Sequence, residues 1–125
     1  MMHEFPKSRR LLKRSEFVAA QRLAVGVRGK HCVMLLHDAG RDGPARLGLV
    51  ASRRVGNAVV RNRAKRKIRD WFRQCEALPR GRDVVVIVLA GASDASWHVL
   101  RRELDGALGK VMRKARRAGD SSVDA

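Results

Sequence analysis

The chain has 125 residues, the size of a single domain, and 45% of them are hydrophobic, which is enough for one modest core. Its 28 lysines and arginines against 12 acidic residues give a formal net charge of +16. A compact chain with this charge repels itself unless a polyanion neutralises it, and the common polyanions are nucleic acids and anionic membranes. No apolar run approaches the roughly 18 residues of a membrane-spanning helix, so nucleic acid is the favoured partner.

The first residues lack the apolar stretch and the cleavage site of a secretory signal, which predicts a cytoplasmic protein. Residues 1–14 carry charge without clear periodicity and predict a flexible basic arm. Ser15 is a candidate N-cap for a short helix that has Phe17 and Gln21 on its first turns. The glycines of segment 26–29 predict a turn.

Two strands are predicted next. The segment 31–36 (HCVMLL) is apolar on both of its alternating faces, as in a strand that is covered on both sides. Turn-forming residues over 38–44 predict a loop, and a second strand follows over 46–51.

The apolar pattern changes period at Ala58. Apolar residues then recur at steps of three and four, which indicates an amphipathic helix with one side facing the core. Asn57 stands at the N-cap position, and Pro79 with Gly81 ends the element. The segment 83–90 (DVVVIVLA) predicts a central strand, 97–116 a second long helix, and 119–125 a frayed tail.

A strand, helix, strand run implies a parallel pair, and the general rule makes its crossover right-handed. Trp71 and Trp97 could serve as platforms for stacking bases, but their positions on apolar helical stripes favour packing. The residues assigned to the core are Leu12, Val33, Leu47, Leu49, Ile68, Trp71, Phe72, Val86, Val88, Leu100, Leu104 and Leu108.

The segment from Arg53 to Arg73 is the most unusual part of the sequence. Asp70 is its single acid, and its nine cations are Arg53, Arg54, Arg61, Arg63, Lys65, Arg66, Lys67, Arg69 and Arg73. Arg61, Lys65 and Arg69 place like charges at i, i+4, which is destabilising unless an external anion is bound. The arginine fork suits phosphate oxygens. The segment therefore predicts a phosphate-binding helix, with an ordinary solvated basic face as the alternative.

The amide side chains of Asn57 and Asn62 can cap the helix or bind a sugar, a phosphate or the water of a bound metal. The helix N-terminus at Gly56 to Val60 is a second natural anion site. Cys32 and Cys75 belong to no Cys-x-x-Cys or Cys/His cluster, so two buried apolar thiols and no metal site are expected.

The string ARLGLVASRRVGNAVVRNRAKRKIRDWFR closely resembles the signature of the protein subunit of bacterial ribonuclease P, the ribonucleoprotein that removes 5′ leaders from precursor tRNA. The motif GNAVxRNRxKRxxR is carried by Gly56, Asn57, Ala58, Val59, Arg61, Asn62, Arg63, Lys65, Arg66 and Arg69. Segments 10–17, 32–36, 84–89 and 97–116 also resemble the family, so the likeness covers nearly the whole chain.

The resemblance implies one RNA-binding domain over 1–125 with an α+β fold. The fold is an α-β-β-α-β-α sandwich (ribosomal protein S5 domain 2-like), and its small central sheet has a left-handed βαβ crossover through the basic helix, against the general rule. It also implies that the RNA subunit catalyses phosphodiester hydrolysis with Mg²⁺ that is bound mainly by the RNA. The protein then needs no catalytic side chains and no metal site of its own, which agrees with scattered histidines (His3, His31, His37 and His98) and carboxylates.

The resemblance further implies which residues touch RNA. Contacts to the catalytic RNA are expected from Arg53, Arg54, Asn57, Arg61, Asn62, Arg63, Lys65, Arg66 and Arg69. A cleft between the first helix and the sheet is expected to hold the single-stranded leader with Phe17, Arg10 and Lys13. Gln21 and Leu35 stand where many relatives are expected to be aromatic, so we hypothesise that leader stacking is weaker here and charge carries more of the affinity.

Three other classes share some of these features. A small ribosomal protein would match the size and charge but not the motif. A helix-turn-helix regulator needs a recognition helix that reads base edges, whereas this basic helix is followed by a buried strand. A protein-only nuclease needs clustered carboxylates or histidines, which this sequence lacks.

Overall fold

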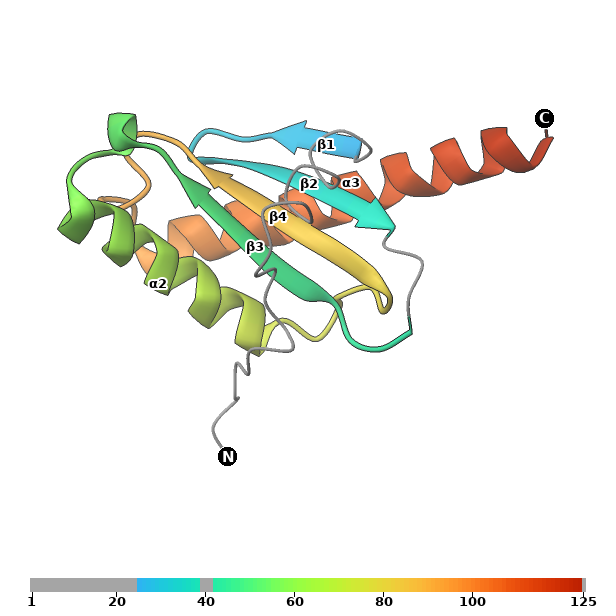
Figure 1. Cartoon of the computed structure of the whole chain (residues 1–125), viewed down its shortest axis with the longest axis horizontal. Coiled ribbons are helices and arrows are strands. Elements are labelled where there is room, and N and C mark those ends of the chain that lie inside the picture. Colours follow the sequence, from blue (N-terminus) through green and yellow to red (C-terminus); the bar gives the residue numbers. More distant parts are fainter. Residues whose placement is uncertain (1–24, 39–41, 125) are drawn as a thin grey trace.

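The computed structural model describes residues 25–38 and 42–124, with side chains described up to Arg117. It contains a four-stranded sheet and two long helices (Figure 1). The strands are β1 (Val25–Arg28), β2 (Cys32–Asp38), β3 (Arg46–Ala51) and β4 (Arg82–Val88). A short 3-10 helix, η2 (Arg53–Val55), precedes α2 (Ala58–Gln74), and α3 (Trp97–Asp124) ends the described chain.

The sheet has the strand order β1-β2-β4-β3. β2 pairs with both β1 and β4 in antiparallel fashion, whereas β3 and β4 are parallel. The parallel pair predicted around the basic helix is therefore confirmed, with α2 as the connection between its two strands. The handedness of that crossover stays a prediction.

Both helices pack their apolar stripes into one core. Alternate residues of the central strands point to the helices, among them Met34 of β2 and Val86 of β4, which are fully buried. α2 contributes Ala64, Ile68, Trp71 and Phe72, and α3 contributes Leu100, Leu104, Leu108 and Val111. Nine of the twelve predicted core residues are buried here, namely Leu47, Ile68, Trp71, Phe72, Val86, Val88, Leu100, Leu104 and Leu108. Leu49 and Val33 are only partly buried, and Leu12 lies outside the described residues.

The predicted turn at 26–29 is wrong, because Val25–Arg28 forms the edge strand β1. The prediction failed because Gly26 was interpreted as a turn residue. An ideal Cβ at Gly26 would lie 2.7 Å from Leu35 Cδ2 across the strand pair, so the glycine serves close packing within a strand. The hairpin is closed by the Gly29 N–H, which donates to the Cys32 carbonyl at 2.8 Å.

Several predicted boundaries also shift. The strand expected over 31–36 runs over Cys32–Asp38, and its two faces differ, since Cys32, Met34 and Leu36 are buried while the residues between them are partly exposed. α2 ends at Gln74, before the proline and glycine that were expected to stop it. α3 continues through most of the predicted frayed tail to Asp124. The predicted arm, first helix and leader residues Arg10, Lys13 and Phe17 lie outside the described residues.

Candidate nucleic-acid interface

The start of α2 is defined by two residues. Asn57 caps the helix as predicted, because its Oδ1 accepts a hydrogen bond from the Val60 N–H at 3.0 Å. Gly56 has φ 150°, and a Cβ there would lie 2.8 Å from Val60 Cγ1, so only glycine fits without distortion. The preceding η2 places Arg53 and Arg54 on the surface beside this capped N-terminus.

The two sides of α2 carry opposite chemistry. Ala64, Ile68 and Trp71 face the core and are at most 2% exposed. Asn62, Arg63 and Arg66 are exposed, and Arg61, Lys65 and Arg69 are half-buried along the margin. Because the buried stripe fixes the rotation of the helix, its cations point in directions that are set before any ligand binds.

Lys65 lies in an electrostatically unfavourable position at the half-buried margin of α2. Burial lowers the pKa of Lys65, and the nearby charges of Arg69 and Arg61, one helical turn away on either side, lower it further. The Nε of Arg61 is buried and has no hydrogen-bond partner in the described part of the chain. A phosphate placed here would relieve both conditions, since it would stabilise the ammonium and accept from the guanidinium.

Two cations of the segment have other roles. The Lys67 ammonium donates to the carbonyls of Ser93 and Ala95 at 2.8 and 2.7 Å, which ties α2 to the loop before α3. Arg73 forms an ion pair with Asp70 one turn away. Neither residue was among the predicted RNA contacts.

A small hollow of about 300 Å³ lies on the exposed side of α2, lined by Val59, Asn62, Arg63 and Arg66. Val59 is 65% exposed although it is large and apolar. The sequence analysis did not predict Val59 as an exposed contact. Its position outside the apolar stripe of Val60 and Ala64 could have indicated that it faces solvent. An apolar side chain between phosphate-binding groups can pack against a ribose or a base.

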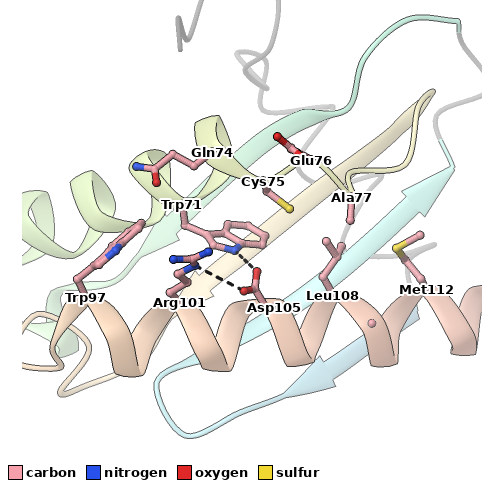
Figure 2. A pocket seen from close by; sticks show the side chains of 11 residues that line it. Trp71, Gln74, Cys75, Glu76, Ala77, Trp97, Arg101, Asp105, Leu108 and Met112 are labelled. Carbon is pink, nitrogen blue, oxygen red and sulfur yellow. Dashed lines mark hydrogen bonds and ion pairs between the residues drawn. The ribbon is translucent and has the colours of Figure 1, made fainter. Parts of the chain in front are cut away.

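The tryptophans are packing residues, as predicted. Trp71 is 2% exposed, and its Nε1 donates to Asp105 Oδ1 of α3 at 2.8 Å. Trp97 is half-buried and packs against the same core. Both line a cavity of about 570 Å³ between the end of α2 and α3, together with Leu108 and Met112 (Figure 2).

The sheet face away from the helices carries a second group of residues. Leu35, Val50 and Ile87 surround the fully buried Val85 on this face. At one end of it Arg46 binds Asp83 through two hydrogen bonds, at 2.9 and 3.1 Å. His37 Nδ1 lies 3.8 Å from the same carboxylate.

The other described histidine near the sheet has a structural partner. His31 Nδ1 lies 2.8 Å from Glu103 Oε1, and the other oxygen of that carboxylate accepts from the backbone N–H groups of His31 and Cys32. His31 therefore has a structural role. The contact joins α3 to the start of β2.

The cysteines are free, and their environment keeps them neutral. Burial, together with the charge of Glu103, raises the pKa of the Cys32 thiol to about 12. Burial also raises the pKa of the half-buried Cys75. Within the described ranges, no three side chains of His, Cys, Asp or Glu lie close enough together to hold a metal ion.

These features define a class: a small α+β protein with a capped, arginine-rich helix displayed along one edge of its sheet. None of the helices in the described part is long and apolar enough to cross a membrane. The family model for Ribonuclease P matches residues 5–112. The chain therefore belongs to the ribonuclease P protein family, whose members are subunits of a ribonucleoprotein endoribonuclease.

Comparison with individual relatives supports the same family. A ribonuclease P protein component from Citrifermentans bemidjiense is 36% identical over 110 residues, which cover 88% of this chain and 94% of the relative. The solved ribonuclease P protein of Staphylococcus aureus superposes with a TM-score of 0.73 at 29% identity, over 84% of this chain and 98% of that one. The protein from Thermotoga maritima gives 0.70 at 30% identity, over 83% and 96%.

Proposed function

We propose that this chain binds the catalytic RNA of ribonuclease P through η2 and α2, and that it assists removal of the 5′ leader from precursor tRNA in the cytoplasm. The observation that carries the proposal is the row of Arg61 and Lys65 at the margin of α2. The Nε of Arg61 is buried and lacks a hydrogen-bond partner among the described residues. The ammonium of Lys65 has a lowered pKa. Phosphates supply what both groups lack.

The exposed contacts of the proposed interface are Arg53, Arg54, Asn62, Arg63 and Arg66, with Val59 between them. Asn57 contributes mainly by capping the helix, since its Oδ1 is already bonded to the backbone. The capped N-terminus leaves other N–H groups of the first turn directed outward, where they favour an anion.

For the leader we propose the sheet face around Val85, on which Leu35 lies, acting with Phe17, Arg10 and Lys13 of the N-terminal segment. The apolar surface of Leu35, Val50 and Ile87 supports this assignment. Leu35 offers less area for stacking than an aromatic ring, so charge carries a larger share of the affinity. The left-handed crossover through α2 is part of the same proposal.

In the assembled ribonucleoprotein, bound Mg²⁺ would supply activation of the attacking water and stabilisation of the leaving oxygen. We propose that the ion is bound mainly by the RNA; within the described residues no group of three His, Cys, Asp or Glu side chains could hold it. The protein's own contribution is to position phosphates and to lower their mutual repulsion.

The decisive experiment adds the pure protein to the catalytic RNA and precursor tRNA at low Mg²⁺. Stimulated 5′ cleavage is expected. Cleavage by the protein without RNA would contradict the proposal, as would the absence of any stimulation.

The leader assignment has its own test. Precursor affinity is measured against salt for Phe17→Ala and for Gln21→Phe. Phe17→Ala is expected to weaken binding, and Gln21→Phe to strengthen it and make it less dependent on salt, because a stacking contact is added. A Gln21→Phe protein that gains nothing while its salt dependence is already shallow would overturn the idea that charge has replaced stacking.

A further inference from the structure

A second concentration of positive charge lies at the other edge of the sheet. A hollow of about 580 Å³ opens between β1 and the C-terminal half of α3. We call it the β1–α3 groove. It is lined by Gly26, Val27, Arg28, Lys110, Arg113, Lys114 and Arg117, and none of these described residues is acidic. β1 is the edge strand opposite β3, and α2 packs beside β3 (Figure 1), so the groove and the α2 interface are on different sides of the molecule.

The shape of the groove follows from the way α3 packs against β1. Its four α3 cations stand at i, i+3, i+4 and i+7, which places them on one face of the helix. The Lys114 ammonium donates to the Gly26 carbonyl at 2.9 Å, which joins the helix to the edge strand. Leu108 and Val111 are buried on the other side of α3 and fix its rotation. The exposed groups of Arg28, Lys110, Arg113 and Arg117 are therefore held together although they repel one another.

This repulsion exists whether or not substrate is present, so it calls for a partner that is permanently bound. In the proposed function the catalytic RNA is such a partner, whereas the precursor tRNA leaves after each turnover. Arginine forks fit phosphate oxygens in pairs. Contacts to phosphates fix the orientation of a protein on a nucleic acid without reading its sequence.

We propose that the β1–α3 groove binds the phosphate backbone of the catalytic RNA at a second point, separate from α2. This inference rests on the proposed function. Two contacts at opposite edges of the sheet hold the protein in one orientation, so that the sheet face between them is presented to the leader.

Two double variants with the same change in charge test the proposal. Arg113→Gln/Arg117→Gln removes two cations of the groove, and Arg102→Gln/Arg116→Gln removes two exposed cations of α3 outside it. Affinity of the full chain for the catalytic RNA alone is measured over a series of NaCl concentrations. The groove variant is expected to bind roughly tenfold more weakly, with a salt slope reduced by about 1.4 to 1.8 for two lost phosphate contacts. The control variant is expected to stay within about twofold of the unmodified protein.

Equal losses in the two double variants, whether large or small, would overturn the proposal, because the groove would then have no special role. A loss confined to reactions that contain precursor tRNA would also overturn it, since the occupant would be the substrate. The pair Arg63→Gln/Arg66→Gln in α2 separates this inference from the proposed function. If the α2 pair weakens RNA binding and the groove pair does not, only the groove assignment fails; if neither does, the proposed function fails as well.

Discussion

At the residue scale, neighbouring cations of α2 have different roles although the sequence alone makes them look alike. Lys65 is half-buried between Arg61 and Arg69, and its pKa is lowered by burial and by their charges. Lys67, two residues on, donates to two backbone carbonyls of the loop before α3. The Lys65 ammonium lies among like charges, whereas the Lys67 ammonium holds α2 to the loop before α3.

Substituting each lysine with glutamine should therefore separate binding from stability. Lys67→Gln is expected to lower the free energy of unfolding by about 1 to 2 kcal/mol, because two part-buried carbonyls lose a charged donor. Lys65→Gln is expected to leave stability unchanged or slightly raised and to reduce the salt slope of RNA binding by about 0.7 to 0.9. Urea unfolding and RNA titrations measure the two effects. An unchanged salt slope for Lys65→Gln would show that Lys65 is not at the interface.

The buried thiol of Cys32 predicts a dependence of stability on pH. Its pKa rises from 9.0 in an exposed thiol to about 12 in the folded protein. The unfolded state thus loses this proton first, and stability present below pH 9 declines as the pH rises towards 12, by up to about 1.4 kcal/mol per pH unit from this group. Urea unfolding of Cys32→Val should show a shallower decline over that window. The same slope in both proteins would mean that the thiol does not contribute.

At the scale of elements, the start of α2 couples the fold to the interface. Asn57 satisfies a backbone donor of the first turn, and Gly56 has both the φ and the space that this turn requires. The helix N-terminus is consequently held in place next to Arg53 and Arg54. Fraying of this turn would disturb stability and RNA binding together.

Two variants of the cap distinguish these effects. Asn57→Ala is expected to cost about 1 kcal/mol of stability and to weaken RNA binding, because the first turn frays. Asn57→Asp keeps the acceptor and suits the positive end of the helix dipole, so stability should be preserved, while its negative charge should repel a phosphate. Calorimetry and RNA titrations provide the two measurements. An aspartate variant that binds RNA as tightly as the native protein would remove the helix N-terminus from the interface.

At the scale of the whole molecule, the net charge of +16 acts in opposite directions on folding and binding. Self-repulsion destabilises the free protein, and salt screens it. Bound RNA neutralises the same charges and stabilises the folded state by mass action. The positive charge that favours RNA binding therefore lowers the stability of the free protein.

Raising NaCl from about 20 to about 200 mM should raise the Tm of the free protein, because the Debye length shortens from about 20 Å to below 10 Å. The same change should weaken binding of the catalytic RNA by at least about tenfold, since counterion release becomes less favourable. Calorimetry of the free protein and filter binding of the complex can be run in the same buffers. A Tm that falls with salt would contradict the self-repulsion on which this prediction rests.

Local signals in the sequence were sufficient for much of this structure. The period change at Ala58 and the cap at Asn57 predicted α2, and the β-branched run predicted β4, because each signal depends on neighbours within a few residues. The outward cations of α2 followed from the same periodicity. β1 was missed, since its glycine has a turn-like signature and only the approach of Leu35 explains it.

By itself, the sequence determined the charge, the amphipathic helices, the parallel pair and, through its motif, the family. These depend on composition and on short spacings. The tertiary structure decided the roles of the cations, because Lys67 binds carbonyls 26 and 28 residues away while Lys65 lies near the charges of Arg69 and Arg61. It also brought Arg28 beside Lys110, Arg113 and Arg117 in the β1–α3 groove, a juxtaposition that arises from packing an edge strand against a distant helix and has no local signature.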